Sequence, residues 1–293
     1  MAVACQRAGL TSTEAAEEKD FEYLRRNLLQ LVNEEREVAK LSKLQMDDFA
    51  SKVATTHAEE MANEDFASHW GRNGFKPYHR FSFAGGIHAT QENISAADNT
   101  WSLKPDELKQ DTSYLHVRLY QERPPNDGHR QAILAPQHTH VGFGIAVVAL
   151  RLRMVELFVS KYVDLKPITQ AAKPKSTISL SGKLLHTNNT LKMIEVFYEP
   201  LPQAPNLEWL RQPHSYALPD ESRVLRPILP PPYFYADQGA GTIEMGSAGE
   251  FKVPISLFKE EPGIYTVVCW VKKSGSEKAF PATEVCIRAD LNG

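Results

Sequence analysis

Two long apolar runs constrain the fold of this chain more than any other feature. Residues Val141–Leu150 and Leu152–Val163 are largely apolar at both even and odd positions, and they meet at Arg151. A strand that is apolar on both faces must be covered on both sides, as in the sheets of α/β proteins. The runs therefore predict two strands buried between layers of helices.

The sequence before these runs shows the periodicity of helices, which could form the covering layers. Apolar residues recur at helical spacing from Phe21 to about Ala39, and Asp47 and Asp48 can cap a second helix that runs to about Met61. A third helix is expected to begin at Pro105 and to end before Pro124, and a short helical turn should follow it over residues 128–134. This order of elements predicts a three-layer α/β/α sandwich.

Glycines mark two other places in the first half. Residues 66–99 mix Gly and Asn with aromatic side chains, which predicts an irregular stretch without regular elements. Gly142 and Gly144 lie inside an apolar run, where the lack of a side chain would let a helix approach the sheet closely.

The second half has the pattern of an all-β domain. Apolar runs of strand length recur between clusters of Pro and Gly, which predicts an immunoglobulin-like β-sandwich, although residues 200–232 are too irregular to assign. The expected strands are Ile178–Leu185, Met193–Tyr198, Phe251–Leu257, Tyr265–Val271 and Thr283–Arg288. The chain of 293 residues is thus divided into a mobile lead-in (1–19), an α/β domain (20–164), a linker (165–177) and a β-sandwich domain (178–293).

Composition and hydropathy argue against nucleic-acid binding and against a membrane-spanning helix. The chain is 42% hydrophobic and 24% charged, with a formal net charge of -3, so it lacks the basic field that drives binding to nucleic acid. No stretch reaches the roughly 18–20 apolar residues of a membrane-spanning helix.

Three cysteines carry limited information. Cys5 follows a short apolar segment that is typical of the end of a bacterial lipoprotein cleavage box, which would give a lipid anchor; an arbitrary start of the chain is the equal alternative. Cys269 and Cys286 lie on two expected strands around a turn, where they would either form a disulfide in an oxidising compartment or remain buried free thiols.

The side chains that can carry chemistry gather in the first half. Eight of the ten histidines lie between His57 and His140. No zinc-protease helix, nucleophile elbow, phosphate loop or paired Cys motif occurs. A reactive or binding site must therefore be assembled from scattered residues.

Several short motifs match one family in the right order. They are Leu31–Arg36, His57 with Met61, Ser68-His69, Glu92-Asn93-Ile94, Gly128-His129-Arg130 with Ile133-Leu134, and Val141–Ala146. With these motifs the first half resembles the CAP superfamily of cysteine-rich secretory, antigen 5 and pathogenesis-related proteins, in its bacterial secreted branch. The match covers roughly residues 22–163.

The resemblance implies a cleft lined by two histidines and two acidic residues. It places His69, Glu92 and His129 in this cleft, and Glu122 as the fourth residue. Pro124–Asp127 departs from the spacing of the family, which puts the position of Glu122 in doubt. The disulfides of animal and plant members are absent here, so their surface loops are not carried over.

Imidazoles and carboxylates in one cleft are compatible with two kinds of site. Neutral His69 and His129 could hold Zn²⁺ or another divalent metal weakly, while Glu92 or Glu122 orients a ring through its far nitrogen. Alternatively the same contacts would form a metal-free polar network.

Other histidines in the first half have a structural interpretation. His57 is expected to be a packed core residue. His138 and His140 could extend a metal site, but a pair of solvated histidines at the edge of a loop is favoured.

Charged and amide side chains near the motifs are expected to support the fold. Asn33 and Arg36 should brace it by hydrogen bonds. Arg130 should pair with an acid of the first helix such as Glu35.

Three functions follow from this sequence. The favoured one is a secreted or cell-envelope binding protein whose cleft takes a small or lipid-like ligand, or a cell-surface ligand, because no nucleophile is evident. The second is a metal-assisted hydrolase with Glu92 or Glu122 as general base. The third is a structural interaction protein with an idle cleft.

Overall fold

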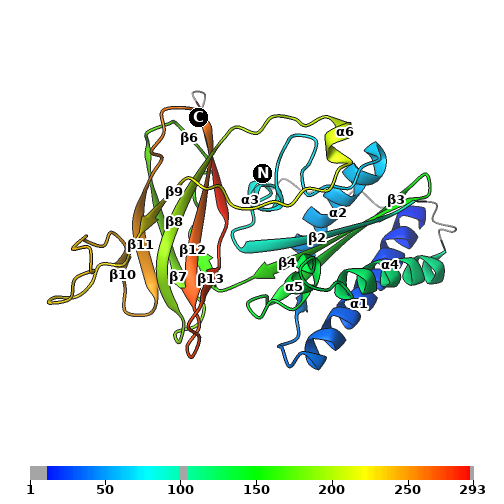
Figure 1. Ribbon diagram of the computed structural model, residues 1–293, viewed down its shortest axis with the longest axis horizontal. Coiled ribbons are helices and arrows are strands. Elements are labelled where there is room, and N and C mark those ends of the chain that lie inside the picture. Colours follow the sequence, from blue (N-terminus) through cyan, green and yellow to red (C-terminus); the bar gives the residue numbers. More distant parts are fainter. Residues whose placement is uncertain (1–11, 99–103, 291–293) are drawn as a thin grey trace, which may run out of the picture.

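The chain folds into two halves that lie side by side (Figure 1). The computed structural model describes residues 12–98 and 104–290. The first half consists of α1 (Ser12–Val38), β1 (Gln45–Met46), α2 (Asp48–Glu64), α3 (Pro77–Phe83), β2 (Ala89–Ala97), α4 (Pro105–Tyr120), α5 (Gly128–Ile133), β3 (His140–Val148) and β4 (Arg151–Ser160). The four strands form one sheet in the order β1-β3-β4-β2.

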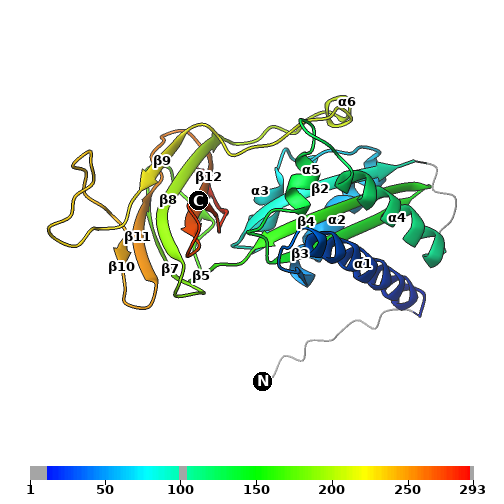
Figure 2. The ribbon, with the colours of Figure 1, turned by 60° about the horizontal axis from the view of Figure 1, so that its bottom comes forward.

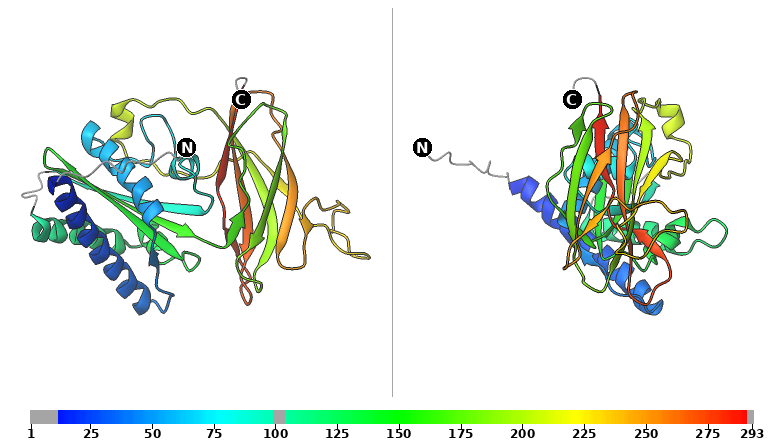
Figure 3. Two further views of the ribbon diagram at one scale, coloured as in Figure 1. Left: turned by 180° about the vertical axis from the view of Figure 1, so that it is seen from behind. Right: turned by 90° about the vertical axis from the view of Figure 1, so that its left-hand side faces the viewer.

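The two apolar runs form the centre of this sheet, as predicted. They are the antiparallel strands β3 and β4, joined by a tight turn in which Ala149 and Leu150 have positive φ. Even-numbered β4 residues such as Met154 and Phe158 pack against α1 and α4, whereas odd-numbered ones such as Val155 pack against α2. The helices therefore cover both faces of the sheet (Figure 3), and the α/β/α layering is confirmed.

Close approach of α2 to the sheet depends on the two glycines of β3. A Cβ atom on Gly144 would lie 2.1 Å from the carbonyl carbon of Ala54, and one on Gly142 would lie 2.2 Å from the backbone nitrogen of Ser51. Both distances are far below van der Waals contact, and the neighbouring atoms are backbone that cannot rotate away. The role predicted for these glycines is confirmed.

We expect Gly144→Ala to lower the free energy of unfolding by about 3 kcal/mol, because the added methyl group forces α2 away from the sheet. Urea denaturation followed by circular dichroism measures this loss. Gly128→Ala is the matched control, because a Cβ there meets nothing within 4 Å. Equal stability of the two variants would contradict this account of the packing.

Residues 66–99 are more regular than predicted. They contain α3 and the nine-residue strand β2, which pairs with β4 along its whole length. The alternating pattern of a strand is hidden here because polar side chains such as Glu92 and Asn93 occupy its buried positions. The expectation of an irregular stretch was wrong.

As far as residue 290, the second half is all-β apart from one short helix. It consists of β5 (Val163–Leu165), β6 (Ala171–Ala172), β7 (Thr177–Leu184), β8 (Thr190–Pro200), α6 (Leu207–Leu210), β9 (Ser222–Leu225), β10 (Glu244–Met245), β11 (Glu250–Ser256), β12 (Gly263–Lys272), β13 (Ala279–Pro281) and β14 (Val285–Ala289). Its two sheets, β10-β11-β7-β5 and β6-β14-β12-β8-β9 with β13 beside β12, enclose one hydrophobic core. Each expected strand coincides with an observed one, whereas the shorter strands were not foreseen.

Both segments expected to lack structure differ from that expectation. Helix α1 begins at Ser12, so it includes part of the expected lead-in 1–19, of which residues 1–11 lie outside the described part of the chain. Residues 165–177, expected to be a linker, contain β6 and the first residue of β7, and Leu165 ends β5. Backbone pairing with the β sheets orders this segment although it has no hydrophobic period.

The cysteine pair does not form a bridge. Cys269 and Cys286 are both buried free thiols. Thr266, three residues before Cys269, is the β12 partner of Cys286, so the thiols lie on opposite faces of the sheet. Cys269 faces the β core, and Cys286 faces Tyr78 of the first half. Cys5 lies outside the described residues.

A long segment of the second half crosses to the first half. We call residues 201–221 the strap: it leaves β8, carries α6 to the first half and returns to β9 (Figure 2). Leu210 of α6 is fully buried in the cluster formed by α2 and the sheet. Arg211 Nε donates a 2.8 Å hydrogen bond to the Asp65 carbonyl, and Arg72 Nη1 donates one of 3.0 Å to that of Pro205.

Candidate functional site

The four acidic and histidine residues singled out in the sequence line a single cavity. Its volume is about 620 Å³, and His69, Glu92, Glu122 and His129 are all in its wall. Glu92 lies on β2 and His129 on α5, while His69 precedes α3 and Glu122 follows α4. Segments far apart in the sequence thus meet in one cleft, as predicted.

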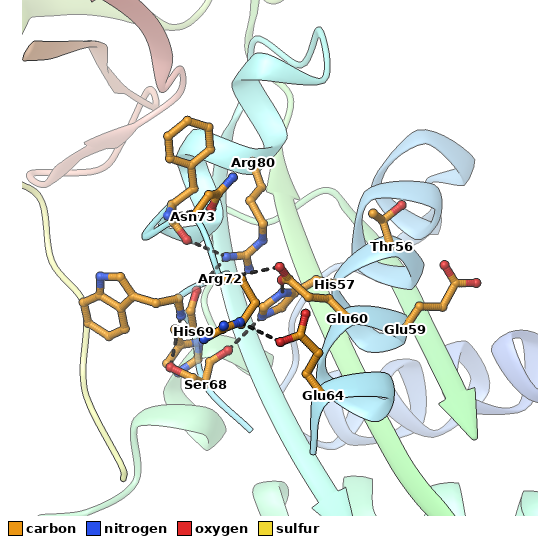
Figure 4. A network of polar contacts seen from close by, with 12 residues as sticks. Thr56, His57, Glu59, Glu60, Glu64, Ser68, His69, Arg72, Asn73 and Arg80 are labelled. Atoms are coloured by element: carbon orange, nitrogen blue, oxygen red, sulfur yellow. Dashed lines mark hydrogen bonds and ion pairs between the residues drawn. The ribbon is translucent and has the colours of Figure 1, made fainter. Parts of the chain in front are cut away.

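On one side of the cleft, Glu92 connects His69 with Arg80. Glu92 Oε1 lies 3.0 Å from His69 Nδ1, and Arg80 Nη2 donates to Glu92 Oε2 at 2.6 Å. Arg80 Nη1 also donates to the carbonyls of His69 (2.6 Å) and Phe75 (2.9 Å), so one guanidinium holds both members of the pair (Figure 4).

The electrostatic setting keeps Glu92 ionised. Burial raises the pKa of its carboxyl, but the charge of Arg80 and the hydrogen bond with His69 outweigh burial and lower the pKa to about 2. A carboxylate held in this way is suited to orienting His69 rather than to accepting a proton near neutral pH.

On the other side, Glu122 holds His129 twice. Its Oε1 lies 2.5 Å from His129 Nδ1, and its Oε2 accepts from the His129 backbone nitrogen at 3.1 Å. The segment between Glu122 and Gly128 contains the prolines that put the assignment of Glu122 in doubt. The Glu122 carboxylate nevertheless contacts His129. In both pairs, Glu92–His69 and Glu122–His129, a carboxylate contacts Nδ1 of the imidazole.

The strap supplies a wall of the cleft that sequence reasoning missed. Tyr216 Oη accepts a hydrogen bond of 2.8 Å from the Glu92 backbone nitrogen, and the Tyr216 ring lies 4.8 Å from the His69 ring, centroid to centroid. Ser215 and Pro281 of the second half also line the cavity. The cleft is therefore built by both halves of the chain.

A buried network lies below the cleft. Asn93 Nδ2 donates to the His129 carbonyl at 3.2 Å and to Glu156 Oε2 at 3.1 Å. Glu156 Oε1 lies 2.6 Å from His116 Nδ1, and His116 Nε2 lies 3.0 Å from Glu35 Oε2. Both ring nitrogens face a carboxylate, so both donate and the imidazole is protonated.

The protonated state of His116 is strongly favoured. Burial lowers its pKa, but Glu156 and Glu35 outweigh burial and raise the pKa to about 10. The network ties α1 and α4 to the sheet and, through Asn93, to the backbone of His129.

A model of the cysteine-rich secretory protein family, CAP, matches residues 29–162. The first half of this chain is a CAP domain. The order of the motifs and the observed fold agree with this assignment.

The chain spans about half the length of the curated relative that it matches. The chain is 26% identical over 135 residues to the uncharacterized protein YkwD of Bacillus subtilis strain 168, and the match covers 46% of this chain and 47% of YkwD.

Two solved structures each match about half of this chain. One is an extracellular protein containing an SCP domain from Bacillus anthracis strain Ames, with 22% identity, a TM-score of 0.37, and coverage of 53% of this chain and 45% of that chain. Another is an outer surface protein of Borrelia burgdorferi, with 18% identity, a TM-score of 0.37, and coverage of 48% and 92% respectively.

Two framework predictions for the CAP domain are confirmed. Asn33 exchanges hydrogen bonds with the backbone of Leu44, at 3.0 Å and 2.7 Å. Arg36 is fully buried and donates to the carbonyls of Ser42, Ile133 and Ala135.

His57 is buried in the CAP domain, as predicted, but it is also part of a polar network. Its Nε2 lies 2.8 Å from the Ser68 carbonyl, and its Nδ1 lies 3.2 Å from Glu60 Oε2. Glu60 in turn accepts from the Arg72 backbone nitrogen at 3.0 Å (Figure 4). The network fixes the backbone directly before His69.

Two other predictions were wrong. Arg130 donates to the Tyr120 carbonyl at 2.6 Å and stacks on the Tyr120 ring, while its expected partner Glu35 contacts His116. His138 is buried in the wall of the cleft rather than solvated, with Nδ1 3.1 Å from Ser160 Oγ and Nε2 3.2 Å from Gln91 Oε1. His140 begins β3 and does not line the cleft.

Within residues 12–98 and 104–290, no group of three or more His, Cys, Asp or Glu side chains is arranged to hold a metal ion. Three imidazoles line the cleft: those of His69 and His129, and that of His138, whose two ring nitrogens already face Ser160 and Gln91. In His69 and His129, Nδ1 is engaged by a carboxylate, and within the same residues neither Nε2 has a hydrogen-bond partner. None of the helices in this part of the chain is long and apolar enough to cross a bilayer.

Proposed function

We propose that the protein is a secreted or surface-associated binding protein whose CAP cleft takes a small polar ligand, with a divalent metal such as Zn²⁺ held weakly by His69 and His129. The family, described as secretory, supports the location. Most residues that line the cleft carry polar side chains, which is compatible with a polar ligand. The β domain, proposed to be an immunoglobulin-like sandwich, would contact a cell-surface ligand.

The observation that carries this proposal is the pairing of each imidazole with a carboxylate through Nδ1. Glu92 and Glu122 fix the two rings in the tautomer that leaves Nε2 for a ligand, which is the arrangement of metal-binding histidines in proteins. The donor set fits a cation such as Zn²⁺, which would act as a Lewis acid toward a bound oxygen atom. Two protein ligands predict modest, reversible affinity.

Calorimetric titration with zinc chloride tests the proposal. We expect His69→Ala and His129→Ala each to weaken binding by at least about tenfold, because one of two protein ligands is lost. His186→Ala, outside the cleft, is the control for adventitious binding and should leave the affinity unchanged. Thermal denaturation of each variant separates loss of the site from loss of the fold. Unchanged affinity in folded His129→Ala would overturn the metal proposal.

The alternative function, a metal-assisted hydrolase, requires Glu92 or Glu122 to act as a general base. A general base works best with a pKa near the working pH. The pKa of Glu92 is lowered to about 2, so Glu122 is the better candidate for a base. A hydrolase predicts that His129→Ala abolishes turnover while the protein stays folded. An idle structural cleft predicts lost stability with no activity to lose.

A further inference from the structure

A second cavity, of about 430 Å³, lies where the two halves meet; we call it the junction pocket. It is lined by Ser42, Lys43, Gln45, Pro136, His138, Thr139, His140, Lys161, Tyr162, Leu185, His186 and Lys273. Three lysines and three histidines are among these residues, and no Asp or Glu is. In a chain of net charge -3, such a lining is a local concentration of positive charge.

Lys273 is the cation of the pocket that has no acidic partner among the described residues. Its Nζ donates to the Pro136 carbonyl at 3.0 Å and lies 4.9 Å from the centre of the Tyr162 ring. Burial lowers the pKa of Lys273, and the nearby charge of Arg36 lowers it further. An anion in the pocket would offset both effects.

Arg36 adds a second cation behind this wall. It is fully buried, it is bonded to carbonyl oxygens alone within the described residues, and its Nη2 has no hydrogen-bond partner. Carbonyl dipoles solvate a guanidinium without neutralising it. The positive charge therefore persists at the junction.

Each of the other two lysines has one acidic partner. Lys161 Nζ lies 3.0 Å from Asp47 Oδ2, and Lys43 Nζ lies 2.8 Å from Glu37 Oε2. Asp47 also caps α2 by accepting from the Ala50 nitrogen, so its charge is shared with the helix N-terminus. Four cations, with Arg36 included, thus face two carboxylates.

The kind of donor indicates the kind of anion. Lysine ammonium groups bind phosphate oxygens as point charges, and no arginine lines the pocket to offer the flat fork that suits bidentate binding of a carboxylate or a phosphate. His140, whose Nδ1 lies 2.9 Å from Thr139 Oγ1, brings a further ring nitrogen to the wall. The volume accommodates a phosphate group with a small substituent.

We propose that the junction pocket binds a phosphate group, as free phosphate or as the phosphate of a small ester or a lipid headgroup, through Lys273, Lys161 and Lys43. Its ligands come from both halves: Lys43 and Lys161 from the CAP side, and Lys273 from the turn between β12 and β13. Bound phosphate therefore stabilises the docking of the two halves. This site is independent of the metal proposed for the cleft.

The test is calorimetric titration of the full chain with inorganic phosphate at constant ionic strength, with Lys273→Gln and Lys43→Gln as site variants. Each substitution removes one charge-assisted contact, so we expect affinity to fall about tenfold for each. Lys192→Gln, an exposed lysine of β8 outside the pocket, is the control and should bind as the parent protein does. Thermal denaturation without phosphate shows that each variant is folded.

Two further arms distinguish the source of the phosphate. Glycerol 3-phosphate represents a small ester, and vesicles of an anionic phospholipid represent a headgroup. Binding of any of the three probes that is lost in Lys273→Gln and kept in Lys192→Gln supports the site and identifies its source. No binding of any probe, or an equal loss in Lys192→Gln, overturns the proposal. Lys273→Gln should bind zinc with unchanged affinity. A failure of the phosphate proposal would therefore leave the metal proposal for the cleft standing.

Discussion

Replacing His116 by Ala is expected to lower the free energy of unfolding by about 3–5 kcal/mol, because it leaves buried carboxylates without their cation. Glu156 is fully buried and would retain only the Asn93 amide, and Glu35 would lose its partner across α1 and α4. Urea denaturation at pH 7 measures the loss.

The same residue predicts how stability depends on pH. The folded pKa of His116 is about 10, above the ordinary value of 6.5. A raised pKa means that the folded state holds the proton more tightly, so this stabilisation is complete below pH 6.5 and is lost as the pH rises toward 10. In His116→Ala this part of the pH dependence should vanish.

His214→Ala provides the comparison for this experiment. His214 stacks on Trp209 in the strap, and within the described residues its ring donates to no buried carboxylate, so its loss should cost less than about 1 kcal/mol. Equal stability of the two histidine variants, or an unchanged alkaline slope in His116→Ala, would show that the network does not hold the imidazole as a cation.

Arg80→Met is expected to have an effect of similar size, about 3–5 kcal/mol, because it removes the guanidinium that balances the buried Glu92 carboxylate and leaves only the His69 ring as its side-chain partner. It also releases the His69 and Phe75 carbonyls, so zinc affinity should fall although no imidazole is changed. Urea denaturation and zinc titration measure the two effects on one protein.

The acid limb of the stability curve gives a further readout. The folded pKa of Glu92 is lowered to about 2, so its stabilisation is complete above the ordinary value of 4.5 and is lost as the pH falls toward 2. In Arg80→Met this acid dependence should shrink. Arg72→Met is the matched control, because Arg72 is partly exposed and pairs with exposed Glu64, so about 1 kcal/mol or less is expected. If both variants unfold equally easily, Arg80 is not the residue that stabilises the cleft.

The layered architecture could be predicted from the sequence because its signals are local. The helical spacing in α1, α2 and α4 and the doubly apolar strands β3 and β4 each occupy one continuous stretch. Strand β2 was not predicted, because several of its buried positions hold polar side chains. These remove the alternation of polar and apolar residues that normally marks a strand.

The cleft was predicted in part, through the resemblance to a family. His69, Glu92, Glu122 and His129 could be placed by their motifs, and the structure brings them together. Arg80, Tyr216, His116 and Glu156 could not, because their roles arise from long-range contacts. Tyr216 and Glu92 are in contact although they lie 124 positions apart in the sequence. No sequence pattern near either residue predicts this contact.

The strap makes the two halves structurally interdependent. Leu210 is buried in a core cluster of the CAP domain, and Tyr216 accepts a hydrogen bond from the backbone nitrogen of Glu92. A recombination event that joined this CAP domain to a different C-terminal partner would uncover both places at once. The exposed apolar surface and the unpaired backbone nitrogen would both lower the stability of such a hybrid protein.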